Sequence, residues 1–112
     1  MSDGEQNLDR VLSPKLIVRD YGTMKLHYHW CPGCEVMHSI AVEQPFRNGA
    51  RWTFDRNAEK PTFSPSINVG PGTKLQCHYF IRAGRIEFCG DSHHALAGQT
   101  VDLPDIPEEE LR

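Results

Sequence analysis

Residues 24–42 read MKLHYHWCPGCEVMHSIAV, and this stretch decides the fold class. Its first part alternates, with Leu26, Tyr28 and Trp30 on one face and Lys25, His27 and His29 on the other. Alternation with a period of two predicts a half-buried strand, and we expect the histidines on its solvent side. CPGC at residues 31–34 interrupts the pattern and residues 37–42 resume it. The stretch therefore predicts a β-hairpin with two thiols at its tip.

A second hairpin is predicted at residues 74–89, around the tight-turn pair Ala83-Gly84. Its register would place Arg82 opposite Arg85, Phe80 opposite Glu87, and His78 opposite Cys89. Shorter strands are expected at residues 15–19, 51–54, 66–69 and 100–103, and residues 57–65 as a loop. No stretch has helical periodicity. The sequence therefore predicts a mostly β, small single-domain antiparallel fold with a zinc-ribbon-like element. Residues 1–14 are expected as a flexible arm, 15–104 as the metal-binding β domain and 105–112 as an acidic tail.

Composition excludes several classes of function. The chain has 112 residues, a net charge of −3, four cysteines and six histidines. It has no run of about 20 apolar residues to span a membrane, and its first residues do not form a secretory signal. We therefore expect a cytoplasmic protein. In a reducing compartment, CxxC with further Cys and His indicates a metal site, with a redox pair and disulfides as the competing interpretations.

Zinc in a structural site takes four tetrahedral ligands, and CPGC supplies Cys31 and Cys34. The remaining ligands would come from Cys77, His78, Cys89, His93, His94 or His38. Neighbours on a strand face opposite ways, so Cys77 and His78 should not bind one ion. Paired positions are close, so His78 and Cys89 could share an ion on one face while Cys77 lies on the other. Cys77 and Cys89 could also be plain buried thiols.

Four motifs resemble a small phage and prophage family of unknown function, whose members often carry the label "ammonia monooxygenase". They are CPGC at 31–34 with His38, KPTFSPSI at 60–67, CH at 77–78 and GDSHHALAGQTV at 90–101. The resemblance covers about residues 27–104 and implies a metal-bound β domain in a phage context. Cys89 is not a position of the family pattern. The resemblance favours Cys31, Cys34, Cys77 and His94 as zinc ligands, with His78 as the alternate.

Three functions stay open at this point. The first is a zinc-stabilised binding or accessory module for an unknown protein or small ligand, and its exposed strand edges are compatible with a homodimer. The second is a small metal-dependent hydrolase with an open zinc site that uses His78, Asp91 and His94. The catalytic candidates are His38, His78 and Asp91; Asp91 could instead orient His94. The third, nucleic-acid binding, would use Trp30, Trp52, Arg47, Arg51 and Arg56, but the net charge speaks against it. The hydroxyl-rich run at residues 60–66 could line a pocket or form turns.

Overall fold

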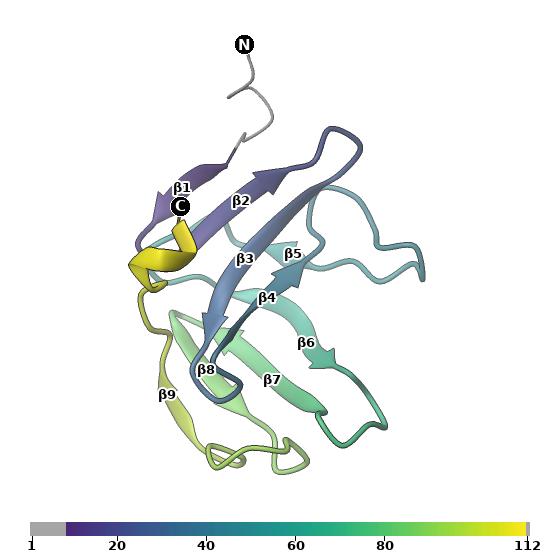
Figure 1. Cartoon of the computed structure of the whole chain (residues 1–112), viewed down its shortest axis with the longest axis vertical. Helices are drawn as coiled ribbons and strands as arrows, with labels where there is room; N and C mark the ends of the chain where they lie inside the picture. Colours follow the sequence, from purple (N-terminus) through teal and green to yellow (C-terminus); the bar gives the residue numbers. More distant parts are fainter. Residues whose placement is uncertain (1–8, 112) are drawn as a thin grey trace.

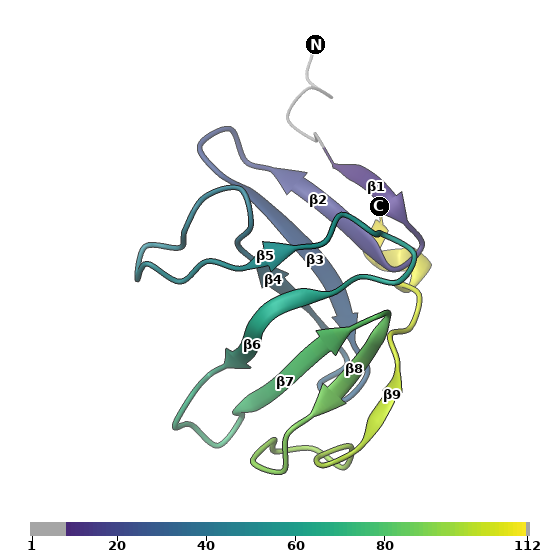
Figure 2. The same cartoon turned by 180° about the vertical axis from the view of Figure 1, so that it is seen from behind.

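The computed structural model describes residues 9–111 and consists of two antiparallel sheets (Figures 1 and 2). The first sheet has the strand order β1 (Arg10–Ser13), β2 (Leu16–Asp20), β3 (Lys25–Cys31) and β4 (Val36–Ile40). The second has the order β5 (Thr53–Phe54), β6 (Phe63–Val69), β7 (Cys77–Arg82), β8 (Arg85–Phe88) and β9 (Thr100–Asp102). A single 3₁₀ turn, η2 (Glu108–Leu111), closes the described chain. The mostly β, antiparallel, single-domain prediction is confirmed.

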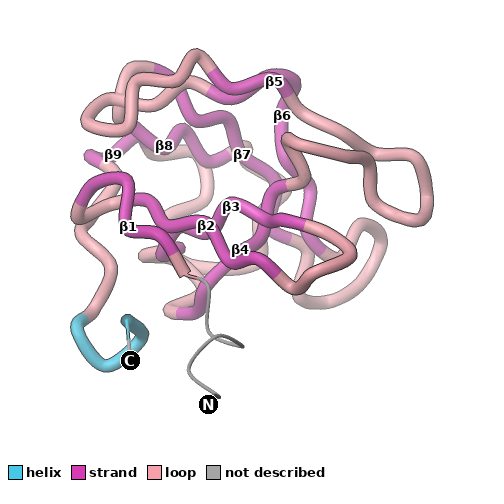
Figure 3. The backbone as a smooth tube through the Cα atoms, turned by 90° about the horizontal axis from the view of Figure 1, so that it is seen from above, coloured by secondary structure: helices cyan, strands magenta, loops and turns pink. Residues whose placement is uncertain are grey.

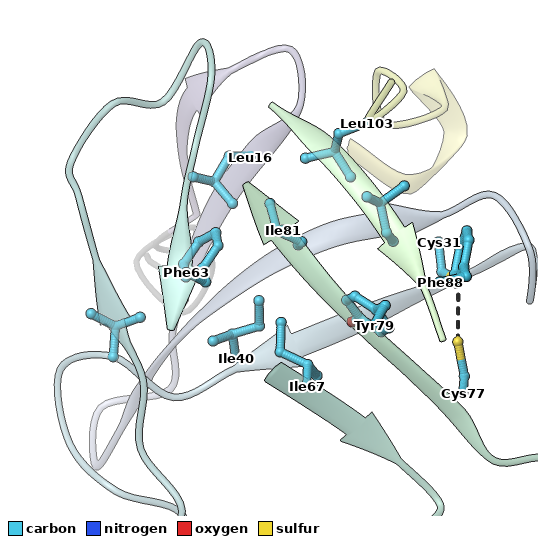
Figure 4. Packing of buried hydrophobic residues seen from close by; sticks show 12 residues of the cluster. Leu16, Cys31, Ile40, Phe63, Ile67, Cys77, Tyr79, Ile81, Phe88 and Leu103 are labelled. Carbon is cyan, nitrogen blue, oxygen red and sulfur yellow. Dashed lines mark hydrogen bonds between the residues drawn. The ribbon is translucent and has the colours of Figure 1, made fainter. Parts of the chain in front are cut away.

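The core lies between the two sheets, which form separate layers when seen from above (Figure 3). Sheet one contributes Leu16 and Ile40, and sheet two contributes Phe63, Tyr79 and Ile81, all at most 1% exposed (Figure 4). Burying side chains of this size stabilises a fold by about 1.5–3 kcal/mol each. Tyr79 is the largest fully buried side chain, and it anchors β7 against sheet one.

The face of β3 that packs against sheet two is the one that carries the histidines. His27 and His29 are 1% and 0% exposed, so their expected place on the solvent side is wrong. Burial alternates along β3 as predicted, but the pattern of one strand does not say which of its faces a second sheet will cover. Aromatic partners explain the burial: the His27 ring meets Phe54 edge-on at 5.2 Å, and His29 Nε2 lies 2.7 Å from the Tyr79 hydroxyl.

The β7–β8 hairpin has the predicted register, with Arg82 opposite Arg85 and Phe80 opposite Glu87. Its two-residue loop has positive φ angles of 49° at Ala83 and 79° at Gly84, the conformation that matches the twist of a tight hairpin. One step beyond β8, the Cys89 N–H donates to the His78 carbonyl at 2.8 Å. His78 and Cys89 are therefore directly opposite each other, as predicted.

β6 differs from the prediction because it begins at Phe63, inside the segment expected to be a loop. Two prolines in residues 57–65 predict a loop, but Pro65 falls where the β6–β7 register shifts between Phe63 and Ile67. A proline is tolerated at such an irregularity because no ladder hydrogen bond is lost. Ser66, predicted as the first residue of a strand, instead lies in the middle of one.

Both ends of the described chain pack on the body of the fold. Residues 1–8 of the expected arm lie outside the described residues, whereas Arg10–Ser13 pair with β2. In the tail, Ile106 is 5% exposed and its N–H donates to the Pro14 carbonyl, and Arg19 donates to the Glu110 carbonyl at 2.8 Å. The acidic tail is therefore attached to sheet one rather than free. Within residues 9–111, no helix has the length and apolar character to cross a membrane.

Candidate active site and metal cluster

Two side-chain constellations lie on opposite faces of β7, and the first is a cysteine–histidine cluster of Cys31, Cys34, Cys77 and His94. One ligand atom from each lies within 4.8 Å of all the others, so the cluster could hold a metal ion. Cys31 Sγ and Cys77 Sγ are 3.9 Å apart, and Cys77 Sγ is 3.3 Å from His94 Nε2. A disulfide needs about 2.05 Å between sulfurs. Two sulfurs on one tetrahedral zinc are about 3.8 Å apart, given zinc–sulfur bonds of about 2.3 Å.

Gly33 shows that the cluster is built around the His94 ring. A Cβ on this glycine would lie 2.2 to 2.4 Å from three atoms of the imidazole, closer than real Cβ contacts. Only glycine leaves room for the ring beside the CPGC turn. The turn itself is closed by the Glu35 N–H, which donates to the Cys31 carbonyl at 2.7 Å. The turn therefore supplies two thiols and a seat for the histidine.

The thiols of the cluster differ in pKa. The Cys77 thiol donates a hydrogen bond that lowers the pKa of Cys31 to about 6, with backbone N–H groups at the turn assisting. That same bond raises the pKa of Cys77, and burial raises the pKa of Cys34 to about 11. Burial also lowers the pKa of His94, which keeps its imidazole neutral and able to coordinate. A divalent cation would offset the repulsion between further thiolates, so the donor set fits a metal.

The second constellation is a hydrogen-bonded triad of Ser66, His78 and Asp91. Ser66 Oγ lies 3.1 Å from His78 Nε2, and His78 Nδ1 lies 3.3 Å from Asp91 Oδ2. The three come from β6, from β7 and from the loop after β8. A hydroxyl, an imidazole and a carboxylate joined in this order form the arrangement that activates a serine nucleophile.

Three further residues hold the triad in place. The Gln76 side-chain amide donates to Asp91 Oδ2 at 3.0 Å. Ser92 Oγ accepts from the His78 N–H at 3.1 Å and donates to the His78 carbonyl at 2.9 Å, which ties the loop to β7. The Trp52 indole N–H donates to the Ser66 carbonyl at 3.1 Å. Each member of the triad thus has a partner that fixes its side chain or its backbone.

The opposite orientations of neighbouring residues on β7 separate the two constellations. Cys77 faces the cysteine–histidine cluster and His78 faces the triad, because neighbouring residues of a strand point to opposite faces. The loop that follows β8 does the same, since Asp91 belongs to the triad and His94 to the cluster. Asp91 therefore orients His78 and not His94. Cys89 lies beside the triad, with its sulfur within 4.8 Å of ligand atoms of His78 and Asp91.

His38, the third catalytic candidate, belongs to a buried network with His29 and Tyr79. The Tyr79 hydroxyl lies 3.0 Å from His38 Nδ1 and 2.7 Å from His29 Nε2. One hydroxyl hydrogen serves one imidazole, so the other imidazole donates its own N–H to the oxygen. Burial lowers the pKa of His38 to about 4 and that of His29 to about 3. Both rings are neutral at pH 7 and join the two sheets.

Comparison with known protein families gives a match over residues 4–89 to a family described as "Bacterial ubiquitination-like system serine protease (BubE)". The chain belongs to the BubE family. Comparison with curated proteins and with solved structures gives no match. The BubE match includes Ser66 and His78 and ends two residues before Asp91, the third member of the triad.

The four residues predicted as metal ligands come together in this BubE chain. Two of the three catalytic candidates, His78 and Asp91, also meet, whereas His38 lies in the Tyr79 network. The sequence predicts no role for Gln76, and it places Trp52 on a candidate nucleic-acid surface rather than beside a nucleophile; Ser66 is predicted only as part of a hydroxyl-rich run. The hydroxyl-rich run at residues 60–66 is the sequence signal for Ser66, but a run of hydroxyls alone does not distinguish a nucleophile from turn or pocket residues. The pairing of β6 with β7, which brings Ser66 to His78, is what separates them.

Proposed function

We propose that the chain is a serine protease in which Ser66 is the nucleophile, His78 the general base and Asp91 the group that orients the base. The observation that carries the proposal is the continuous chain from Ser66 Oγ through both His78 nitrogens to Asp91. The description of the BubE family as serine proteases of a bacterial ubiquitination-like system supports it. The natural substrate is accordingly a protein of such a system.

In the first half-reaction, Ser66 Oγ attacks the carbonyl carbon while His78 Nε2 takes the hydroxyl proton. Asp91 accepts the His78 Nδ1–H, which holds the tautomer with a free Nε2 and stabilises the imidazolium. His78 then gives its proton to the leaving amine, the carbon–nitrogen bond breaks and an acyl-serine ester remains. A water molecule, deprotonated by His78 in the same way, hydrolyses the ester and returns Ser66 to its starting state.

The cysteine–histidine cluster has a structural role in this proposal, with zinc as the metal. A set rich in thiolates is typical of closed structural zinc sites. Cys77 precedes the base directly, and His94 follows Asp91 by three residues. A metal on Cys77 and His94 would therefore fix the strand and the loop that carry His78 and Asp91. The proposal thus combines two of the predicted functions: the structural metal site of the accessory module and the hydrolytic activity of the hydrolase.

The other interpretations have less support. A metal-dependent hydrolase of His78, Asp91 and His94 would need one site, but His94 lies with the thiols and the other two lie with Ser66. A nucleic-acid surface would need free basic side chains. The Arg51 guanidinium instead donates to the Val42 and Glu43 carbonyls. Arg56 pairs with the Glu43 carboxylate at 3.2 Å.

Hydrolysis of p-nitrophenyl acetate tests the proposal, because this small activated ester needs no substrate-specific contact. We expect Ser66→Ala and His78→Gln each to lower kcat by a factor of about 1,000 or more. Ser64→Ala is the matched control, an exposed hydroxyl on the same strand whose loss should leave the rate unchanged. Equal rates in Ser66→Ala and Ser64→Ala would contradict the proposal. Loss of activity on brief chelation, with Ser66→Ala still active, would favour a metal-dependent hydrolase.

A further inference from the structure

A cleft of about 550 Å³ opens beside the nucleophile. We call it the β4–β6 cleft, because residues 37–39 of β4 and residues 66–69 of β6 line two of its sides, and the segment 46–52 lines a third. Ser66 is among its lining residues. Its volume is within the range of about 300–1,000 Å³ that is usual for ligand sites.

The β6 side of the cleft is a strand edge without a neighbour. β5 pairs with β6 only at Phe63 and Ser64, so the rest of β6 is paired on the β7 side alone. The His78 N–H and carbonyl point toward β8 and its loop, because they bond to Ser92 Oγ and the Cys89 N–H. Opposite residues of an antiparallel pair alternate between exchanging hydrogen bonds and turning away. Asn68, opposite His78, therefore turns its N–H and carbonyl away from β7 toward the cleft.

The β4 side is a second free edge, since β4 ends its sheet (Figure 1). The Ala41 carbonyl, just beyond β4, points outward and accepts from the Trp52 N–H at 2.8 Å. By the same alternation, Met37 and Ser39 turn their backbone groups outward as well. Both residues line the cleft. Within residues 9–111, no strand pairs with either edge along the cleft.

The third side of the cleft offers an apolar surface. The Trp52 and Phe46 rings meet edge-on at 6.1 Å, and Ala50, Val69 and Pro71 lie around the same space. Trp52 also holds the Ser66 carbonyl through its indole N–H, so the aromatic wall is tied to the nucleophile. No Lys, Arg, Asp or Glu is among the lining residues. An uncharged side chain of a substrate could be buried here without desolvating a charged group of the protein.

We propose that the β4–β6 cleft binds the substrate as an extended polypeptide segment, which adds as a strand between the two edges and places an apolar side chain against Trp52 and Phe46. The inference rests on the proposed function and names the form of its substrate. Backbone hydrogen bonds to Asn68, Met37 and Ser39 would supply affinity without regard to sequence, and the aromatic wall would supply specificity. A folded surface could not reach both edges, so the scissile bond lies in an unfolded tail or linker.

The binding test uses Ser66→Ala, which separates binding from cleavage. The probes are acetylated, amidated octapeptides of alanine and serine that carry one leucine, or one aspartate at the same position. We expect the leucine peptide to bind about tenfold more tightly or better, since a buried leucine favours binding by at least that factor. By ¹⁵N NMR, hydrogen exchange at the Asn68 amide should slow on binding. The Ile67 and Val69 amides, already paired with β7, are the internal controls.

N-methylation of the leucine peptide at successive positions tests the strand itself. A bound strand uses alternate N–H groups on each edge, so we expect affinity to fall at specific positions and not uniformly. The inference is overturned if neither peptide binds at 5 mM peptide (about the limit of NMR detection), if leucine and aspartate bind equally, or if Asn68 exchange is unchanged. Failure of the proposed function is distinct: the peptide would bind as described, yet Ser66→Ala and wild type would turn over p-nitrophenyl acetate equally.

Discussion

Replacement of Gly33 by alanine is the most direct structural perturbation of the cysteine–histidine cluster. The new Cβ would lie 2.2 Å from the nearest His94 ring atom, whereas ordinary contacts are 3.4–4 Å. The imidazole would therefore have to retreat by more than about 1 Å, and metal–ligand distances tolerate only about 0.2 Å. Even the loss of an outer-shell partner costs a metal site 10–100-fold in affinity, so displacing a ligand should cost about 100-fold or more.

Cobalt titration measures this effect, because thiolate-to-cobalt absorption reports the ligand set and zinc competition then gives relative affinities. We expect Gly33→Ala to bind about 100-fold more weakly than wild type, equivalent to about 2.7 kcal/mol. Gly90→Ala is the matched control, since nothing lies within 4 Å of its Cβ and its φ is not in the left-handed range. Equal affinity in the two variants would refute the assignment of His94 as a ligand seated on Gly33.

The remaining predictions concern the triad and its surroundings. Asp91→Asn should lower kcat by about 100-fold or more by favouring the wrong His78 tautomer, with little change in thermal midpoint because the Asp91 side chain is 53% exposed. Burial holds the pKa of His38 near 4 and that of His29 near 3, both below the ordinary 6.5, so the unfolded chain takes up protons first as pH falls. The free energy of unfolding should be nearly constant above about pH 7 and fall below it, with His38 contributing about 3 kcal/mol of the loss by pH 4. Urea titrations of His38→Asn should show a decline that is shallower by about that amount. Added zinc should inhibit ester hydrolysis by binding His78, Cys89 and Asp91. Cys89→Ser should raise the inhibition constant for zinc about tenfold or more, with no loss of rate when zinc is absent. An unchanged inhibition constant in Cys89→Ser would exclude this mode of zinc binding.

Much of the fold follows from local patterns. Alternation in residues 24–42 and 74–89 predicts both hairpins, and the Ala83-Gly84 turn sets the β7–β8 register. The same parity places Cys77 and His78 on opposite faces of one strand. These features depend only on a strand's own geometry and on one tight turn, which the sequence contains.

The triad could not be predicted in the same way because it depends on which strands become neighbours. Ser66 and His78 meet because β6 pairs with β7 so that Asn68, two residues beyond Ser66 on the same face, lies opposite His78. The side of β3 that becomes buried likewise depends on the position of sheet two. Trp52, just before β5, reaches the Ser66 carbonyl across 14 residues of sequence, and a predicted strand at residues 51–54 does not say which strand it will meet. Such contacts are set by packing between elements, and no local periodicity encodes them.

Site-specific labelling by a fluorophosphonate tests the central claim most directly. An activated Ser66 Oγ should displace fluoride from phosphorus and form a covalent ester, which peptide mass spectrometry locates to one residue. The account predicts one adduct per chain, on Ser66, that is lost in His78→Gln and retained in Ser64→Ala. An unlabelled protein, an adduct on another serine, or equal labelling in His78→Gln would contradict it.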